Sequence, residues 1–193
     1  ALNFAWSNRQ MITHWTRKSF ERVFSQTESD LDMKLVYDVA HNIAKVEKHN
    51  VNGEERKLVV HRKGATRAFP SNRNEIPSKY RDLGQPVLVP GSMGTSSWIL
   101  LGKSNSMDLS FGSTAHGAGR TMSRSKARRN FTEDSVKKSL NDKGIFIKAL
   151  TRDGVVEETP QAYKDVDSVV NVSHNWGIAT KVAKLVPIGV IKG

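Results

Sequence analysis

The sequence contains no cysteine, which excludes both a disulfide framework and a metal site built from thiolates. It also has no apolar run near the ~20 residues that a membrane-spanning helix needs, and no signal peptide at its start. We therefore expect a soluble, cytoplasmic protein. Because the first residue is Ala1 rather than methionine, we also expect that an upstream segment has been removed.

Acidic residues are scarce, and the shortage is local. The chain has 30 basic and 19 acidic residues and a net charge of +11. Residues 56–81 hold eight basic residues and one acid, and residues 109–132 hold five basic residues and none, so these two segments carry nearly all the excess. Such a concentrated positive field favours a polyanionic partner, most commonly nucleic acid. The alternative is a basic surface that is merely solvated.

The 193 residues, of which 37% are hydrophobic, are enough for one globular domain with its own core. Hydrophobic periodicity predicts helices at 2–24, 120–130, 132–140 and 161–177, and strands at 34–40, 43–49, 56–62, 85–90, 98–101, 145–151 and 178–192. Asn52-Gly53 predicts a hairpin turn, 61–70 a basic loop and 152–154 a turn. Because strands and helices do not alternate regularly, we predict an α+β fold with mixed sheets and flanking helices.

The stretch 111–120 reads Phe-Gly-Ser-Thr-Ala-His-Gly-Ala-Gly-Arg and places His116 before two glycines. Glycines at 117 and 119 leave the backbone N–H groups open to an anion, and a helix starting just after them would add its positive end. This pattern indicates a phosphate beside a nucleophilic or general-acid histidine. A glycine-rich turn that caps a helix beside a structural histidine is the alternative.

Other segments allow two interpretations. His41, at the end of a predicted strand, is either a structural residue or a metal ligand, and the remaining histidines show no ligand spacing with it. The loop 91–97, made of glycines and hydroxyl side chains, either holds a ligand or is a tight turn. If 120–130 is helical, Arg120, Arg124 and Arg128 share one face.

Several long motifs, in one order along the whole chain, resemble the C-terminal portion of the RtcB family of RNA-splicing ligases. The longest are Tyr-Asp-Val-Ala-His-Asn-Ile-Ala-Lys-Val-Glu at 37–47 and His-Arg-Lys-Gly-Ala-Thr-Arg-Ala-Phe at 61–69. Further stretches at 84–95, 112–120, 158–167 and 187–193 complete the resemblance. We therefore expect residues 1–193 to be the C-terminal part of a single RtcB-like catalytic core whose upstream half is absent.

The resemblance implies GTP- and manganese-dependent joining of RNA ends that carry a 2′,3′-cyclic phosphate or 3′-phosphate to 5′-hydroxyl ends, as in tRNA splicing or RNA repair. It makes His116 the nucleophile that becomes guanylylated, His41 a manganese ligand and Asn42 a neighbour of the nucleotide. It further assigns to the guanylate site Pro90, Gly91, Ser92, Met93, Ser97, Gly117, Ala118, Gly119, Tyr163 as a stacking surface and Lys192 at the guanine. RNA or phosphate binding would fall to Lys63, Arg120 and Arg124.

Two departures from the family pattern bear on activity. Many relatives carry cysteine before the nucleophile, where this chain has Ala115, and we expect that change to be mild. The family's remaining manganese ligands come from the upstream half, so we predict that the chain alone is inactive or nearly so. Its expected partners are RNA, the missing N-terminal half and an activator of the archease type. The competing hypothesis is a non-catalytic RNA-binding module with a vestigial nucleotide site.

Overall fold

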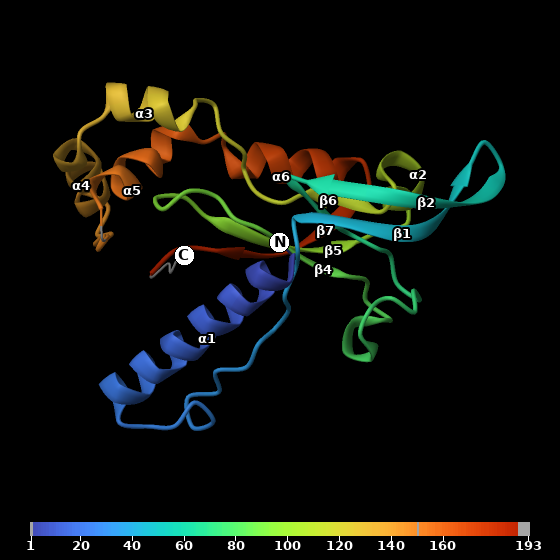
Figure 1. The fold of residues 1–193 in the computed structure, drawn as a ribbon, viewed down its shortest axis with the longest axis horizontal. Helices are drawn as coiled ribbons and strands as arrows, with labels where there is room; N and C mark the ends of the chain where they lie inside the picture. The colour runs from blue at the N-terminus through green and yellow to red at the C-terminus, as the bar shows by residue number, and fades with distance from the viewer. Residues whose placement is uncertain (1, 150, 189–193) are drawn as a thin grey trace.

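Helices and short sheets alternate irregularly along the chain, as the α+β prediction expects. A computed structural model describes residues 2–149 and 151–188 (Figure 1). The helices are α1 (Leu2–Phe24), α2 (Asn105–Ser110), α3 (Arg124–Asn130), α4 (Glu133–Asn141), α5 (Arg152–Glu157) and α6 (Val166–Asn175). The strands are β1 (Asn42–Val51), β2 (Glu54–Lys63), β3 (Ala65–Arg67), β4 (Pro86–Val89), β5 (Ser97–Gly102), β6 (Ser113–Ala115) and β7 (Ala179–Leu185).

Every strand pair in the described residues is antiparallel, so the expectation of mixed sheets was wrong. The pairs form one three-stranded sheet, β4-β5-β7, and two two-stranded sheets, β1-β2 and β3-β6. None of the helices in 2–149 and 151–188 has the length and apolar character needed to cross a bilayer.

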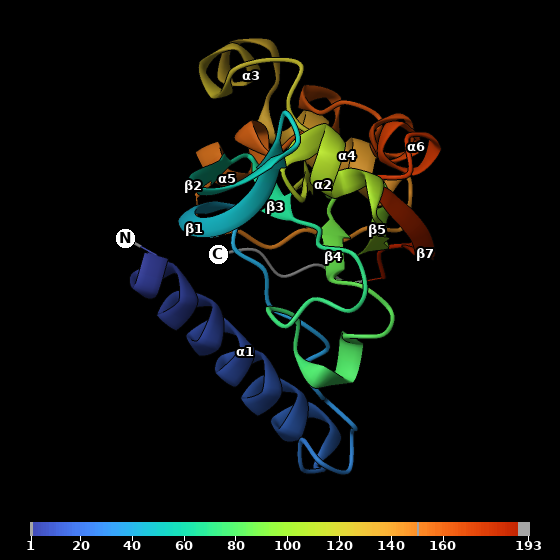
Figure 2. The same cartoon turned by 90° about the vertical axis from the view of Figure 1, so that its right-hand side faces the viewer.

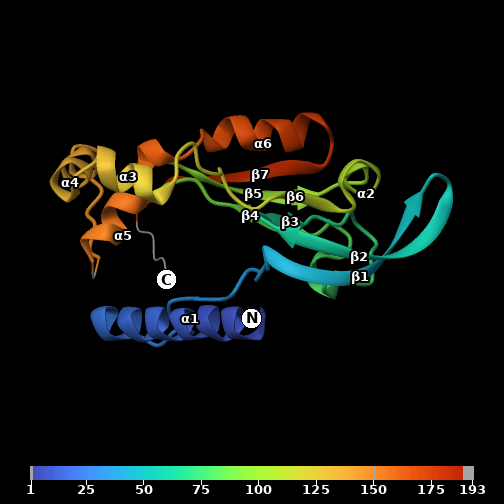
Figure 3. The ribbon, with the colours of Figure 1, turned by 45° about the horizontal axis from the view of Figure 1, so that its top comes forward.

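The main core lies between the three-stranded sheet and α6, which runs along one face of that sheet (Figure 3). Val87 and Val89 alternate inward on β4 and meet Leu100 of β5, as the period of a half-buried strand requires. Val166 and Val170, four residues apart on α6, close the core from above. This core supports the loops that leave the ends of β4 and β6.

The Asn52-Gly53 hairpin prediction is confirmed. Both residues have positive φ, +56° and +88°, which is the backbone of the tight turn that matches the twist of the strands. The register pairs Asn42 at the start of β1 with Lys63 at the end of β2. The hairpin projects away from the body, and its base lies beside the β3-β6 sheet (Figures 1 and 2).

A second, smaller core joins α4 to α5 at one end of the molecule (Figure 1). It consists of Val136, Leu140 and Val155, with Met93 packed against them. The Thr132 side chain caps α4 and exchanges hydrogen bonds with Ser135, so the predicted helix start is confirmed.

The predicted helix at 2–24 is confirmed as α1, but none of its residues is buried. It lies apart from the strands (Figures 2 and 3) and is tied to the following segment by polar contacts. Arg9 forms an ion pair with Asp38 at 2.6 Å, and Arg17 donates to the carbonyl oxygen of Met33 at 2.8 Å. Its apolar residues therefore remain on the surface.

Two predicted strands, 34–40 and 145–151, are wrong. Residues 34–40 and 145–149 lie outside the assigned helices and strands, because apolar alternation makes a strand only where another strand supplies hydrogen-bonding groups. The turn predicted at 152–154 is the first part of α5, whose start Thr151 caps by accepting from the amide of Gly154.

Both helices predicted to follow a glycine or proline begin later than expected. The helix predicted from 120 begins at Arg124, with Ser123 as its cap. The helix predicted from 161 begins at Val166, capped by Asp165, after a short 3-10 turn at Pro160–Ala162. Residues 119–121 instead run beside 162–164, where Thr121 donates to Ala162 and Lys164 donates to Gly119.

Candidate nucleotide site

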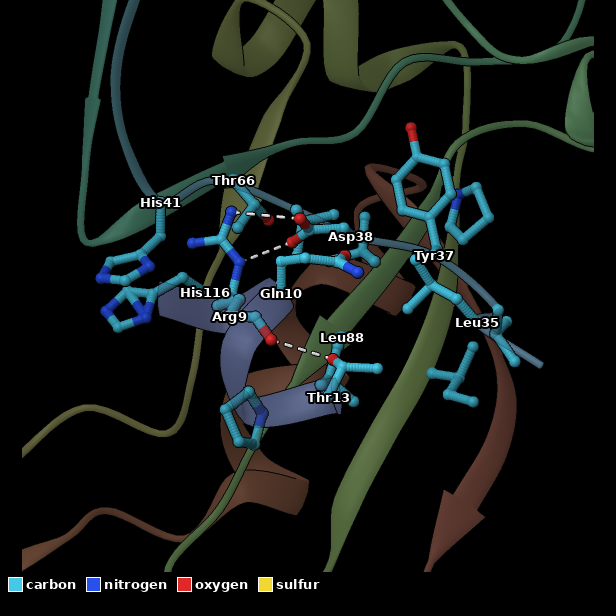
Figure 4. Close-up of a pocket in the computed structure, with 16 residues that line it drawn as sticks. Arg9, Gln10, Thr13, Leu35, Tyr37, Asp38, His41, Thr66, Leu88 and His116 are labelled. Carbon is cyan, nitrogen blue, oxygen red and sulfur yellow. Dashed lines mark hydrogen bonds and ion pairs between the residues drawn. The ribbon is translucent and has the colours of Figure 1, made fainter. Parts of the chain in front are cut away.

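The structure brings His41 and His116 together although 75 positions separate them. Their rings are stacked with centroids 4.7 Å apart and an interplanar angle of 24° (Figure 4). His116 follows β6 directly, and His41 immediately precedes β1. Gly64 sits between their chains: its amide donates to the carbonyl oxygen of His41, and a methyl group on it would lie 3.6 Å from the His116 ring.

The pKa of His116 is lowered from its ordinary value. Burial of the ring is the larger cause, since it disfavours the charged form, and the nearby His41 adds to it. His116 therefore carries a neutral imidazole at neutral pH, with a lone pair on one ring nitrogen. That is the form in which histidine acts as a nucleophile or a base.

A cavity of about 710 Å³ opens beside the two histidines (Figure 4). The Arg9–Asp38 ion pair crosses its polar side, and Tyr37, Val87 and Leu88 are among its apolar lining. Among the expected site residues that the structure describes, Pro90 is the one other in its wall. The cavity is large enough for a nucleotide-sized ligand.

The loop after His116 packs against the end of β4, which joins two of the predicted guanylate segments. Ala118 donates to the carbonyl oxygen of Pro90 at 2.9 Å, and a methyl group on Gly117 would lie 3.3 Å from that oxygen. The Ala118 amide is used, whereas the amides of Gly117 and Gly119 donate to no group among the described residues. Gly119 has a φ of +73° and open space above its Cα.

The predicted ligand loop 91–97 is held by its own hydroxyl groups. Ser92, which is buried, donates its amide to Thr95 Oγ1 at 2.8 Å, and its own Oγ accepts from the Gly94 amide. Ser97 Oγ accepts from the Gly91 amide at 3.4 Å. Met93 faces the small core of α4 and α5 rather than the cavity. These contacts shape the loop independently of any ligand.

Tyr163 and Arg120 lie together. The Arg120 guanidinium is 4.9 Å from the centroid of the Tyr163 ring, and its Nη1 donates to the phenol oxygen at 3.1 Å. Burial is the first cause that raises the pKa of Tyr163, and Glu158 adds to it. One face of the ring predicted to stack on guanine is therefore occupied by the cation.

Arg120, Arg124 and Arg128 converge on one residue, although Arg120 lies outside the helix. Arg120 Nη2 donates to the backbone oxygen of Glu157 at 2.7 Å, and Arg124 Nε lies 3.2 Å from the Glu157 carboxylate. Arg128 forms an ion pair with the same carboxylate. The helix was expected to direct its positive end at the glycine loop, but α3 begins only at Arg124, and one amide of its first turn, that of Lys126, donates to Ser123 Oγ.

The basic loop predicted at 61–70 is wrong, because 61–63 end β2 and 65–67 form β3. Lys63 is exposed and stands opposite Asn42 across the hairpin. Arg62 is 2% exposed and cannot contact a polyanion. Lys192 lies outside the described residues.

Comparison with known proteins decides the family. The chain matches the family described as "tRNA-splicing ligase RtcB" over residues 1–193. The chain belongs to the RtcB family. It is 56% identical over 193 residues to the tRNA-splicing ligase RtcB of Thermococcus kodakarensis, covering 100% of this chain and 40% of that relative. The Aeropyrum pernix relative is 58% identical over 193 residues with the same coverage, and the Pyrococcus abyssi relative is 56% identical with 21% of its length covered. The chain therefore spans about 40% or less of these RtcB relatives.

The described residues do not make up a manganese site by themselves. Among them, no group of three or more histidine or carboxylate side chains could hold a metal ion, and His41 is the one expected ligand. An exposed imidazole is a suitable manganese ligand, but a site needs further ligands.

Three residues that line the cavity or contact the expected site residues were not predicted from the sequence. Arg9 and Asp38 form the ion pair that links α1 to the cavity wall. Glu157 binds Arg120, Arg124 and Arg128. Asp38 lies within the motif 37–47, so its place beside His41 was a signal. The sequence holds no signal for Arg9 or Glu157, because charged residues are common on the surfaces of helices and only the fold determines which partner each one meets.

Proposed function

We propose that the chain carries the nucleophile and much of the guanylate pocket of a GTP- and manganese-dependent RNA ligase. This enzyme would join RNA ends bearing a 2′,3′-cyclic phosphate or 3′-phosphate to 5′-hydroxyl ends. The observation that carries the proposal is the neutral, half-buried His116 stacked on His41 at the wall of a nucleotide-sized cavity. Membership of the RtcB family supports the reaction class.

In the proposed reaction, a ring nitrogen of His116 attacks the α-phosphate of GTP. A nitrogen–phosphorus bond forms, the bond to the β-phosphate bridging oxygen breaks, and pyrophosphate leaves. A 2′,3′-cyclic phosphate end is first opened by water to the 3′-phosphate. An oxygen of the 3′-phosphate then attacks the phosphorus of the GMP and the bond to His116 breaks. Finally the 5′-hydroxyl of the second RNA bonds to the 3′-phosphorus, and GMP leaves. The amides of Gly117 and Gly119, which have no partner among the described residues, would donate to phosphate oxygens as charge develops on them.

Manganese, when bound, would supply a Lewis acid near the phosphates, with His41 as one ligand. The other ligands would belong to the upstream part of the enzyme, which is the principal proposed partner besides RNA. We therefore expect little activity from this chain on its own. An archease-type activator is a further proposed partner.

The test is the intact mass of the chain after incubation with GTP and manganese, alone and combined with the remaining part of an RtcB protein. We expect an acid-labile GMP adduct only in the combined sample, and none with His116→Ala. An adduct on the chain alone would contradict the dependence on the remaining part. If neither sample gives an adduct while RNA still binds, the chain is a binding module with a vestigial nucleotide site.

A further inference from the structure

Arg62 is a buried cation that the reaction proposed above does not use. Its guanidinium makes two parallel bonds to Glu47, with Nη1 donating to Oε1 and Nη2 to Oε2, both at 2.8 Å. The side chains of Arg62 and Glu47 are 1% and 3% exposed. His49 completes the group, since its Nε2 lies 3.1 Å from Glu47 Oε2. A paired charge in this environment keeps one geometry, because any other arrangement would leave a desolvated charge unpaired.

The remaining donors of Arg62 reach the turn that precedes His116. Nε donates to Ser113 Oγ at 2.9 Å, and Nη2 donates to the carbonyl oxygen of Phe111 at 2.9 Å. Phe111 and Gly112 both have positive φ, +50° and +62°. A non-glycine residue such as Phe111 holds that conformation only where its surroundings fix it. Arg62 supplies that fixation by binding the carbonyl group of the same residue.

The turn has no freedom to move towards the core. A methyl group on Gly112 would come within 2.4 Å of the Phe69 ring, and the carbonyl oxygen of Gly112 accepts from Ala68 at 2.7 Å. The Arg62 guanidinium lies 5.9 Å from the centroid of the same ring. The turn is therefore held between Phe69 on one side and Arg62 on the other.

From this turn the chain runs directly to the nucleophile. Ser113 begins β6, which pairs with β3 so that Ser113 faces Arg67 and Ala115 faces Ala65. Arg62 lies three residues before Ala65 at one end of this short sheet, and its side chain bonds to Ser113 at the other end. Both ends therefore depend on the same buried side chain. The next residue, His116, then meets Gly64 and stacks on His41.

We propose that Arg62, held by Glu47, is a positioning residue for His116. It fixes the 111–113 turn and so sets where β6 delivers the imidazole. The inference rests on the proposed function for its kinetic consequence, but the position of residues 113–118 can be measured independently of that function.

Two substitutions separate positioning from general stability. Arg62→Lys keeps the charge but not the directed bonds of the guanidinium. Ser113→Ala removes the Nε contact, together with the bond from Ser113 Oγ to the carbonyl oxygen of Phe111 at 3.3 Å, and leaves the Glu47 pair. They are made in the chain combined with the remaining part of an RtcB protein. Lys48→Ala, which breaks an exposed ion pair with Glu55 in the same hairpin, is the matched control. Leu100→Ala, in the main core, is the control for lowered stability.

We expect the rate of GMP attachment at saturating GTP to fall about 10- to 100-fold in Arg62→Lys and about 3- to 10-fold in Ser113→Ala. The GTP concentration for half the maximal rate should change by less than about twofold, since the pocket itself is intact. Lys48→Ala should match the wild type, and Leu100→Ala should lower Tm without lowering the rate. Should Arg62→Lys fail to fold, Ser113→Ala decides the question.

Rates that stay at the wild-type level in both variants, or that fall equally in Leu100→Ala, would overturn the positioning role. If the wild type forms no GMP adduct, the proposed function fails and hydrogen exchange decides the inference. Faster exchange of the amides of 113–118 in both variants than in Lys48→Ala would support it. Unchanged exchange there would overturn it.

Discussion

His116 combines two properties that a nucleophilic histidine needs. Burial keeps its imidazole neutral, and β6 and Gly64 hold it at the wall of the cavity. The burial of His116 could be suspected from the neighbouring glycines in the sequence, since a side chain flanked by glycines packs closely against the backbone. The second property could not, because the partners that place His116 come from residues 41 and 64, far away in the sequence.

Glu47 gives the fold an acid-sensitive point. Burial would raise the pKa of this carboxyl, but the hydrogen bonds from Arg62 and His49 and the charges of Arg62 and Arg67 outweigh it, so the pKa lies below its usual value. A lowered carboxyl pKa contributes stability that is fully present above the unfolded value of about 4.3 and is lost as the pH falls towards the folded value. The ion pair therefore stabilises the hairpin at neutral pH and weakens in acid.

We predict that Glu47→Gln lowers the free energy of unfolding by about 3 kcal/mol at pH 7, because Arg62 is left buried without a counter-charge. The difference from the wild type should shrink as the pH is lowered from 5 to 3. Urea denaturation of both proteins at several pH values measures this. A difference that stays constant over that range would mean that folding does not change the pKa of Glu47.

At the scale of elements, α3 and its flanking residues form a strongly cationic segment, with five basic residues and no acid between 120 and 130. Glu157 partly neutralises Arg124 and Arg128, whereas Lys126 and Arg129 are exposed and form no ion pair among the described residues. The segment therefore keeps a net positive field that an RNA backbone can use.

We predict that Arg124→Ala weakens binding of single-stranded RNA about threefold at low salt, and that the loss shrinks at high salt as one phosphate contact is removed. Fluorescence anisotropy over a salt series measures both effects, with Lys48→Ala on the hairpin as the control. Equal losses at all salt concentrations would contradict a phosphate contact. So would an equal loss in the control.

The elements that the sequence predicts correctly are those whose signal is local. The Asn52-Gly53 turn, the Thr132 cap and the alternation of Val87 and Val89 each depend on neighbours within four residues. The failures at 34–40 and 145–151 are segments whose structure depends on a distant partner strand, which apolar alternation cannot reveal. The prediction of a basic loop at 61–70 was wrong for the same reason, because Arg62 is buried in an ion pair with Glu47, which lies on another strand.

At the scale of the whole molecule, α1 is the element that the described chain leaves without a core. Phe4 is 82% and Trp15 62% exposed, and Val23 and Phe24 are exposed on the same helix. Aromatic side chains of this size contribute most of their stabilisation when buried, and a surface that gathers several of them marks an interface. Since RtcB relatives are more than twice as long as this chain, we propose that their remaining part covers α1.

We predict that combining the chain with that remaining part slows hydrogen exchange of the amides in 2–24 by about tenfold or more, because a helix with no packed face opens readily and a covered one does not. Mass spectrometry of the α1 peptides measures the rates, with the peptide spanning β4 as an internal control whose residues are already buried. Phe4→Ser with Trp15→Ser should weaken the association and, with it, the GMP adduct on His116. An adduct that forms at the normal rate while α1 exchanges as fast as in the chain alone would show that the remaining part acts on the cavity without covering this helix. In that case α1 would influence the site through the residues that it contributes to the cavity wall, which are Arg9 with its ion pair to Asp38, Gln10 and Thr13.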